Sequence, residues 1–150
     1  MNIEDKNTDI ALGNQTLHYA KDSLLAGKKA TFQTLGCKLN FAETSSLRDT
    51  LSRYGVSPAE AGETADICIV NTCSVTDVAD HKCRQVIHRL TREHPDAFVV
   101  VLGCYAQLQP EKIARFPGVD LVIGMEQKGD VVRYIREGLA QRQALEKGAN

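Results

Sequence analysis

The sequence predicts an α/β fold, an open and doubly wound parallel sheet of four to five strands with helices on both faces. Two apolar runs, residues 66–71 (DICIVN) and 98–102 (FVVVL), have the length and composition of strands buried on both faces. Segments with helical periodicity alternate with these runs, which is typical of a parallel sheet. Right-handed crossovers between such strands place helices on both faces of the sheet.

The elements follow one another from residue 29 onward, in a domain that we expect to occupy residues 29–147 after a mobile amino-terminal extension of residues 1–28. Strands are expected at residues 30–35, 55–64 (weak, or a loop), 66–71, 98–102 and 119–123. Helices are expected at residues 40–54, 75–94, 110–116 and 131–143. The first helix is predicted to have Asn40 as its N-cap and Glu43 as the second member of a capping box. This order indicates a flavodoxin-like or Rossmann-like arrangement.

The helix at 75–94 has an apolar and a basic side. Its apolar residues recur at spacings of three and four and form one stripe that faces the core: Val75, Val78, Ala79, Cys83, Val86, Ile87 and Leu90. Between His81 and His94 the other side carries four Lys or Arg residues and three of the four histidines. We interpret this side as a solvated helix face, with a contact to RNA phosphates or to a neighbouring domain as the alternative.

Composition is that of a soluble globular protein, with 150 residues, 43% hydrophobic, 25% charged and a net charge of −1. The apolar runs are too short for a membrane span, and the polar start does not resemble a secretory signal. Five cysteines without an export signal indicate a reducing compartment, so we expect a cytoplasmic protein without structural disulfides. The near-neutral charge gives no overall argument for nucleic-acid or membrane binding.

Three of the cysteines follow predicted strands at the same offset. Cys37, Cys73 and Cys104 each lie two residues beyond the end of a strand. Because the carboxyl ends of parallel strands lie along one edge, where open α/β sheets bind their ligands, the three thiols are expected to converge. Gly36 and Gly103 precede two of them and allow close approach of a bulky group.

Several interpretations of these thiols remain open. Free cysteine is commonly a small buried hydrophobe, and we assign that role to Cys68 in mid-strand and Cys83 on the apolar helix stripe. A structural zinc site usually includes a C-x-x-C pair, which this sequence lacks. Three thiolates without an obvious fourth ligand suit an iron–sulfur cubane with one open iron. A metal-free flavodoxin-like module that binds a small ligand or partner at the same edge is the further alternative.

The cysteines belong to longer motifs that resemble a known family. These are residues 34–40 (TLGCKLN), 71–76 (NTCSVT) and 103–107 (GCYAQ). Together they resemble the amino-terminal domain of the methylthiotransferases, radical S-adenosylmethionine enzymes that insert a methylthio group into tRNA or a ribosomal protein. The resemblance runs from about Ala30 to Ile135. It implies that Cys37, Cys73 and Cys104 hold an auxiliary [4Fe–4S] cluster.

The branch of the family is indicated by residues beside these cysteines. Lys38, the pair Val75-Thr76 and the run 82–85 (KCRQ) resemble the enzymes that act at C2 of N6-threonylcarbamoyladenosine next to the tRNA anticodon. The isopentenyladenosine branch tends to have Gln at the position of Lys38 and Arg at the position of Thr76. The ribosomal-protein branch tends to have Pro-Lys-Asn after the first cysteine. The resemblance therefore implies a tRNA substrate.

One departure from the family pattern limits the expected activity. The Cys-x-x-x-Cys-x-x-Cys motif of the catalytic domain does not occur, and neither does the RNA-binding β-barrel. The resemblance then implies that S-adenosylmethionine and a second [4Fe–4S] cluster belong to an absent radical domain, which generates the substrate radical at C2. The cluster on this domain would present sulfur to that radical. We expect the isolated domain to be inactive, with the absent domain and, through the full-length enzyme, tRNA as partners, and no membrane.

Overall fold

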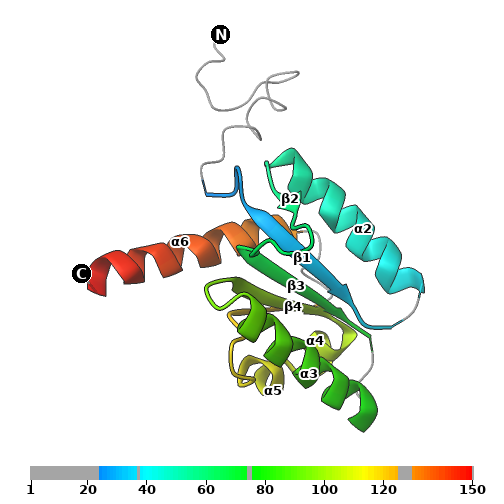
Figure 1. Cartoon of the computed structure of the whole chain (residues 1–150). Helices are drawn as coiled ribbons and strands as arrows, with labels where there is room; N and C mark the ends of the chain where they lie inside the picture. Colours follow the sequence, from blue (N-terminus) through cyan, green and yellow to red (C-terminus); the bar gives the residue numbers. More distant parts are fainter. Residues whose placement is uncertain (1–23, 37, 74–75, 125–129, 150) are drawn as a thin grey trace.

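The computed structural model describes residues 24–36, 38–73, 76–124 and 130–149, with side chains up to residue 146. Its sheet has five strands, all parallel, in the order β2-β1-β3-β4-β5 (Figure 1). The strands are β1 (Lys29–Thr34), β2 (Ser57–Pro58), β3 (Ile67–Thr72), β4 (Phe98–Gly103) and β5 (Leu121–Ile123). The helices are α2 (Lys38–Arg53), α3 (Asp77–Glu93), α4 (Cys104–Leu108), α5 (Pro110–Ala114) and α6 (Val131–Ala149). The predicted doubly wound parallel sheet is confirmed.

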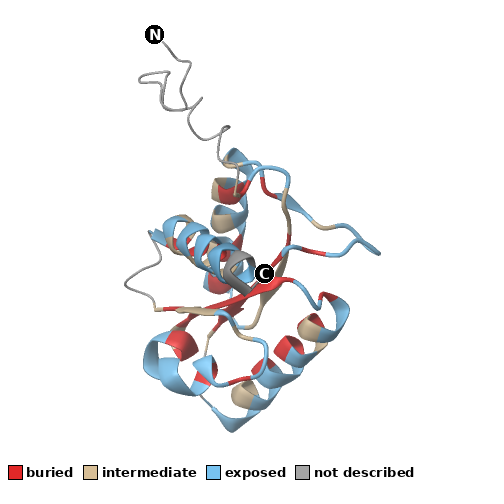
Figure 2. Cartoon of the chain, turned by 90° about the vertical axis from the view of Figure 1, so that its left-hand side faces the viewer, coloured by how far each residue is buried: buried red, intermediate tan, exposed pale blue. Residues whose placement is uncertain are grey.

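Helices cover the sheet on both faces and form two apolar cores with it. Helices α2 and α6 lie on one face, where Leu51 and Ile135 pack against β3 and β4. Helices α3, α4 and α5 lie on the other, where Ile87, Leu90 and Ile113 pack against the same strands. Buried residues accordingly concentrate on the strands and on the inner sides of the helices (Figure 2).

The two central strands are buried along their whole length, but their composition changes near the carboxyl end. Every residue of β3 and β4 is buried. In β3 the apolar run ends at Val70, and the last two residues are Asn71 and Thr72, exposed by only 1% and 2%. Polar side chains buried in the centre of a parallel sheet require hydrogen-bond partners. The site described below supplies them.

The predicted N-cap of the first helix is wrong. Helix α2 begins at Lys38, so Asn40 lies in its first turn rather than before it. The side chain of Asn40 is buried at 5% exposure, and its Nδ2 donates to the main-chain oxygen of Thr72 at 2.8 Å. A tertiary hydrogen bond therefore uses the side chain that the local pattern assigned to a cap.

The predicted apolar stripe of the second helix is right in its centre and wrong at its start. Cys83, Val86, Ile87 and Leu90 are buried as expected. Helix α3 begins at Asp77 with Thr76 as its N-cap, and Val78 in the first turn is 76% exposed. This turn lies beyond the end of the strands, so no sheet surface is available to cover Val78. Val75, the first predicted member, lies outside the described residues.

Smaller differences concern the weak elements and the ends. The uncertain second strand is reduced to two residues paired with Lys29 and Ala30. The sequence analysis missed α4, a single turn that starts at Cys104. Leu25, which precedes the predicted domain start, is fully buried in the core, while residues 1–23 lie outside the described residues. Among the helices described, none is long and apolar enough to span a bilayer.

Helix α6 should contribute to stability through its first half only. Ile135 is fully buried, so Ile135→Ala is expected to lower the free energy of unfolding by about 2–5 kcal/mol through lost burial and a residual cavity. Leu145, in the second half of the helix and 75% exposed, is the control, and Leu145→Ala should change it by less than about 0.5 kcal/mol. Urea unfolding measures both, and equal effects would contradict the packing described.

Candidate functional site

The strand order defines where a ligand site is expected. The chain passes from β1 outward to β2 and then returns past β1 to β3, so the winding direction reverses between β1 and β3. In open α/β sheets, ligands bind outside the carboxyl ends of the strands at this switch point. The loops after β1 and β3 flank it, and these two loops contain Cys37 and Cys73.

Two of the three predicted ligands are described, and they lie at neighbouring strand ends. Thr72 at the end of β3 is paired in register with Gly103 at the end of β4. Cys73 and Cys104 follow these paired residues directly, and both are half-buried. Register therefore brings these two cysteines to adjacent positions at the carboxyl edge. Cys37 lies outside the described residues, so the predicted convergence of all three stays a prediction.

A glycine packs directly on Cys73. The backbone of Gly36 has a φ of +134°, and a Cβ at this position would lie 2.3 Å from Cβ and 3.0 Å from Sγ of Cys73. Gly103 has a φ of +109°, and a Cβ there would lie 2.1 Å from the main-chain oxygen of Thr72. Both positions therefore exclude any side chain. At Gly36 and Gly103, each directly before a motif cysteine, the backbone therefore packs against the end of the neighbouring strand without an intervening side chain.

A cavity of about 240 Å³ opens beside Cys73. Leu35 and Val78 contribute apolar wall, Tyr105 contributes its ring, and Lys82 contributes a cationic side chain. Cys73 thus lines a small, partly apolar space between the loops after β1 and β3 and the start of α3. Such a space can receive a compact group held by soft ligands and limit the access of water to it.

Tyr105, directly after Cys104, ties α4 to α3. Its ring is buried and its hydroxyl donates to Oδ1 of Asp80, which lies 3.5 Å from Nζ of Lys112. Oδ2 of the same carboxylate accepts from Nε of Arg84 at 2.9 Å. The hydrogen bond from Tyr105 and the two cations hold the pKa of the Asp80 carboxyl below its usual value. Burial and the same carboxylate raise the pKa of the Tyr105 phenol. Sequence reasoning missed this pair, since 25 residues separate its members and each has ordinary neighbours.

The remaining two cysteines are core residues, as predicted. Cys68 and Cys83 are 0% and 1% exposed and pack in the same apolar cluster as Ile87. Burial raises the pKa of the Cys68 thiol, and burial together with the charge of Asp80 raises that of Cys83 to about 11. Both are therefore protonated and inert at neutral pH.

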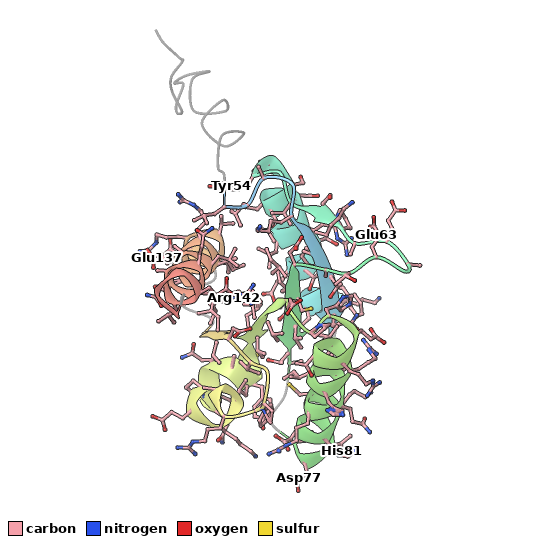
Figure 3. All side chains as sticks on the ribbon, turned by 60° about the vertical axis from the view of Figure 1, so that its left-hand side comes forward. Tyr54, Glu63, Asp77, His81, Glu137 and Arg142 are labelled. Carbon is pink, nitrogen blue, oxygen red and sulfur yellow. The ribbon has the colours of Figure 1, made fainter. Side chains whose placement is uncertain are left out.

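The basic side of α3 is exposed over most of its length, which agrees with a solvated helix face. Its last histidine, His94, is instead buried, and its Nδ1 accepts from the main-chain nitrogen of Ala65 at 2.9 Å. Asp77 and His81 stand near the start of the helix, at the opposite end of the molecule from Tyr54 (Figure 3). Two of the four cations on this side are paired within the helix, Arg84 with Asp80 and Arg89 with Glu93. The contact to RNA phosphates considered above remains an alternative for this face.

Two of the three predicted metal ligands, Cys73 and Cys104, lie within the described residues. Within residues 24–36, 38–73, 76–124 and 130–149, no group of three or more His, Cys, Asp or Glu side chains is arranged to hold a metal ion. Cys37 falls in a gap between these ranges, so the described residues include two of the three predicted thiols. The two thiols that are described, those of Cys73 and Cys104, fit a soft metal centre, because thiolate is a soft ligand. Gly36 also carries no side chain beside Cys73.

Strand order and switch point define the class: a flavodoxin-like α/β domain whose candidate ligand site lies at its carboxyl edge. The chain belongs to the family described as "Uncharacterized protein family UPF0004", whose model matches residues 29–124. These residues extend from the first residue of β1 to just beyond β5 and include all three motif cysteines.

The relatives of this chain carry the names of tRNA-modifying enzymes. It is 40% identical over 119 residues to the threonylcarbamoyladenosine tRNA methylthiotransferase MtaB of Bacillus subtilis, covering 79% of this chain and 26% of the relative. It is 36% identical over 115 residues to the protein of the same name from Aquifex aeolicus, covering 77% and 28%. It is 42% identical over 98 residues to a tRNA-2-methylthio-N(6)-dimethylallyladenosine synthase of Nitratidesulfovibrio vulgaris, covering 63% and 22%. The chain thus spans about a quarter of the length of these relatives.

Thiol alkylation should separate the four described cysteines into two classes. In the native protein at pH 8, Cys73 and Cys104 should react with iodoacetamide at least about tenfold faster than Cys68 and Cys83, because burial and raised pKa values protect the latter pair. Peptide mass spectrometry after timed quenching gives the four rates. Equal rates for Cys83 and Cys73 would contradict the assignment of Cys83 to the core.

The Tyr105–Asp80 hydrogen bond should give a pH-dependent stability. Tyr105→Phe is expected to lower the free energy of unfolding by about 1–3 kcal/mol at pH 7, because a hydrogen bond to a half-buried carboxylate is lost. The pKa of Asp80 is lowered in the fold, so this contribution is present above the ordinary carboxyl pKa of about 4 and disappears as the pH falls through the lower value.

Urea unfolding at pH 7 and at pH 3 tests this dependence. The difference between Tyr105→Phe and the unsubstituted chain should shrink at the lower pH. Tyr134→Phe, at a half-buried tyrosine on α6, serves as the control for loss of a phenol hydroxyl. A deficit that stays constant between the two pH values would contradict a charge-assisted bond to Asp80.

Proposed function

We propose that this chain is the auxiliary [4Fe–4S] cluster domain of a tRNA methylthiotransferase. Cys37, Cys73 and Cys104 are the proposed ligands of the cluster. The substrate proposed for the whole enzyme is N6-threonylcarbamoyladenosine next to the anticodon, modified at C2 of its adenine.

One observation carries the cofactor assignment. Cys73 and Cys104 directly follow the in-register pair Thr72–Gly103, so two half-buried cysteines stand at the ends of adjacent strands. Their position at the carboxyl edge, beside the switch point between β1 and β3, is where this class of fold binds ligands. Membership of the family and the names of the relatives support the same assignment.

The described residues fit an inorganic cluster. Thiolates are the ligands that iron–sulfur clusters prefer. Gly36 leaves room against Cys73 that any side chain would fill, and Gly103 keeps the start of α4 against β3. A cluster bound by three cysteines supplies an iron with a free coordination position, at which sulfur can be carried. The chain's own part is to hold three thiolates at one edge and to shield them on the side of Leu35 and Tyr105.

The complete reaction requires more than this chain contains. Since the chain spans about a quarter of its relatives' length, the proposal assigns S-adenosylmethionine, a second [4Fe–4S] cluster and the generation of the radical to a further domain of the full-length enzyme. Binding of tRNA is likewise proposed for the full-length enzyme. The domain alone is proposed to bind its cluster but not to catalyse methylthiolation.

The branch assignment rests on motif residues and on names. Lys38 and Thr76, beside the first two motif cysteines, match the threonylcarbamoyladenosine branch. Two of the relatives reported above bear that name, and a third bears the dimethylallyladenosine name at similar identity over a shorter stretch. Mass spectrometry of tRNA nucleosides from a strain that lacks the full-length protein decides between them, because the unmodified precursor of the correct nucleoside accumulates.

Iron and sulfide analysis of anaerobically reconstituted protein tests the cofactor assignment. The chain is expected to bind about four irons and to show broad visible absorbance. Cys37→Ala, Cys73→Ala and Cys104→Ala should each abolish the absorbance. Cys68→Ala and Cys83→Ala are matched controls and should retain it.

Three outcomes would contradict the assignment in different ways. Loss of the absorbance in the two control variants alone would place the metal elsewhere. A colourless protein that stays metal-free after reconstitution would favour a ligand-binding module. Zinc in place of iron and sulfide would indicate a structural zinc site.

A further inference from the structure

Two asparagines exchange hydrogen bonds beneath the candidate site. Nδ2 of Asn40 in α2 donates to the main-chain oxygen of Thr72 at 2.8 Å. Nδ2 of Asn71 in β3 donates back to the main-chain oxygen of Asn40 at 3.0 Å. The two side chains are 5% and 1% exposed, so water hardly competes for these bonds. We call this reciprocal pair the Asn40–Asn71 clasp; it crosses the switch point between β1 and β3.

Hydroxyl groups extend the clasp to the ends of all three strands that precede the cysteine motifs. Oγ1 of Thr44 donates to the main-chain oxygen of Asn40 at 3.0 Å and accepts from Nδ2 of Asn71 at 3.2 Å. Its single proton being used, it accepts from Oγ1 of Thr34 at 2.8 Å, at the end of β1. On the other side, Oγ1 of Thr72 donates to the main-chain oxygen of Leu102 in β4 at 2.8 Å.

Packing alone does not explain this network. The residues that precede Asn71 in β3 are apolar, and apolar side chains at the two clasp positions would fill the same space without the cost of burying amides. What amides add is direction, because each bond fixes the position of one group relative to another. The fixed groups are the first turn of α2 and the residue immediately before Cys73.

The clasp also lies next to Gly36, the glycine that packs on Cys73. A Cβ on Gly36 would lie 3.0 Å from Sγ of Cys73 and 3.5 Å from Cγ of Asn40. Gly36 is thus enclosed between the clasp and the thiol, and the bond from Asn40 to Thr72 holds these parts together. Loss of the clasp would release Gly36 and the Cys73 loop from each other while the apolar cores on both faces remain.

We propose that Asn40 and Asn71 are positioning residues, which hold the Cys73 thiol in the orientation that the cluster requires before any metal is bound. This inference rests on the proposed cluster function. The two asparagines act through the backbone of Thr72 and do not themselves ligate the metal. Thr44 supports them through its hydroxyl.

The test uses Asn40→Leu, which removes the amide at similar volume in a helix, together with two substitutions of Thr44. Thr44→Val removes the hydroxyl at constant shape, and Thr44→Ser keeps it. Thr50→Val is the matched control, because Oγ1 of Thr50 also donates to the carbonyl four residues earlier in α2, that of Ser46, and takes no part in the clasp.

Two readouts separate positioning from general stability. In the metal-free chain, alkylation of Cys73 should become roughly tenfold faster in Asn40→Leu, the factor that corresponds to one hydrogen bond, while the Cys104 rate stays within about twofold. After reconstitution, the same variant should bind less iron and give an altered electron paramagnetic resonance spectrum of the reduced cluster. Thr44→Val should show the same changes in smaller measure, and Thr44→Ser and Thr50→Val should behave like the unsubstituted chain.

The inference is overturned if Asn40→Leu folds and keeps the original Cys73 rate, iron content and spectrum. Should Asn40→Leu fail to fold, the comparison of Thr44→Val with Thr44→Ser decides: equal Cys73 rates in the two overturn it, and a faster rate in Thr44→Val supports it. If the unsubstituted chain binds no cluster, the proposed function fails, while the Cys73 rates in the metal-free variants still decide whether the clasp positions this thiol.

Discussion

The parallel pairing of β3 with β4 is the constraint on which the site depends. Both strands are buried at every residue, so a shift of one residue would turn apolar side chains away from the cores that enclose them. The register fixed in this way ends with Thr72 opposite Gly103. Gly103 has no side chain, and this allows the two strand ends to stay in contact, because a Cβ there would collide with the backbone of Thr72. The positions of Cys73 and Cys104 then follow from the pairing of the residues before them.

A change of chemistry along β3 separates the apolar part of the strand from the end that carries the candidate site. The strand is apolar as far as Val70 and then continues into Asn71 and Thr72, which are as deeply buried. From this point hydrogen bonds replace apolar packing as the means of holding neighbouring segments, and they reach α2 through Asn40 and β4 through Leu102. Apolar packing sets which faces meet, and the hydrogen bonds set how the loops at the edge are oriented. A site that must hold a compact cofactor needs both.

How much of this could be predicted from the sequence depended on the range of the interaction. Uninterrupted apolar runs identify β3 and β4, because burial on both faces leaves a clear pattern. The sequence also shows that Cys73 and Cys104 follow the ends of these runs at the same distance, so their place at the carboxyl edge could be predicted. Asn40 was misassigned because an asparagine near a helix start looks the same whether it caps the helix or bonds a distant strand.

Two further residues show the same limit. Val78 continues a helical stripe in the sequence, yet it extends past the end of the sheet and remains 76% exposed. Tyr105 belongs to the third cysteine motif in the sequence. Its hydrogen bond to Asp80 joins residues 25 positions apart and therefore leaves no local sequence pattern. Helix α4 was missed because a single turn is too short to show a period.

Anomalous X-ray scattering at the iron edge, from crystals of the anaerobically reconstituted chain, tests the central claim most directly. The account predicts iron at the carboxyl edge of β1, β3 and β4, within bonding distance of the sulfurs of Cys37, Cys73 and Cys104. Iron bound at another place, or ordered Cys73 and Cys104 thiols beside an edge without metal in a chain that carries iron elsewhere, would contradict it.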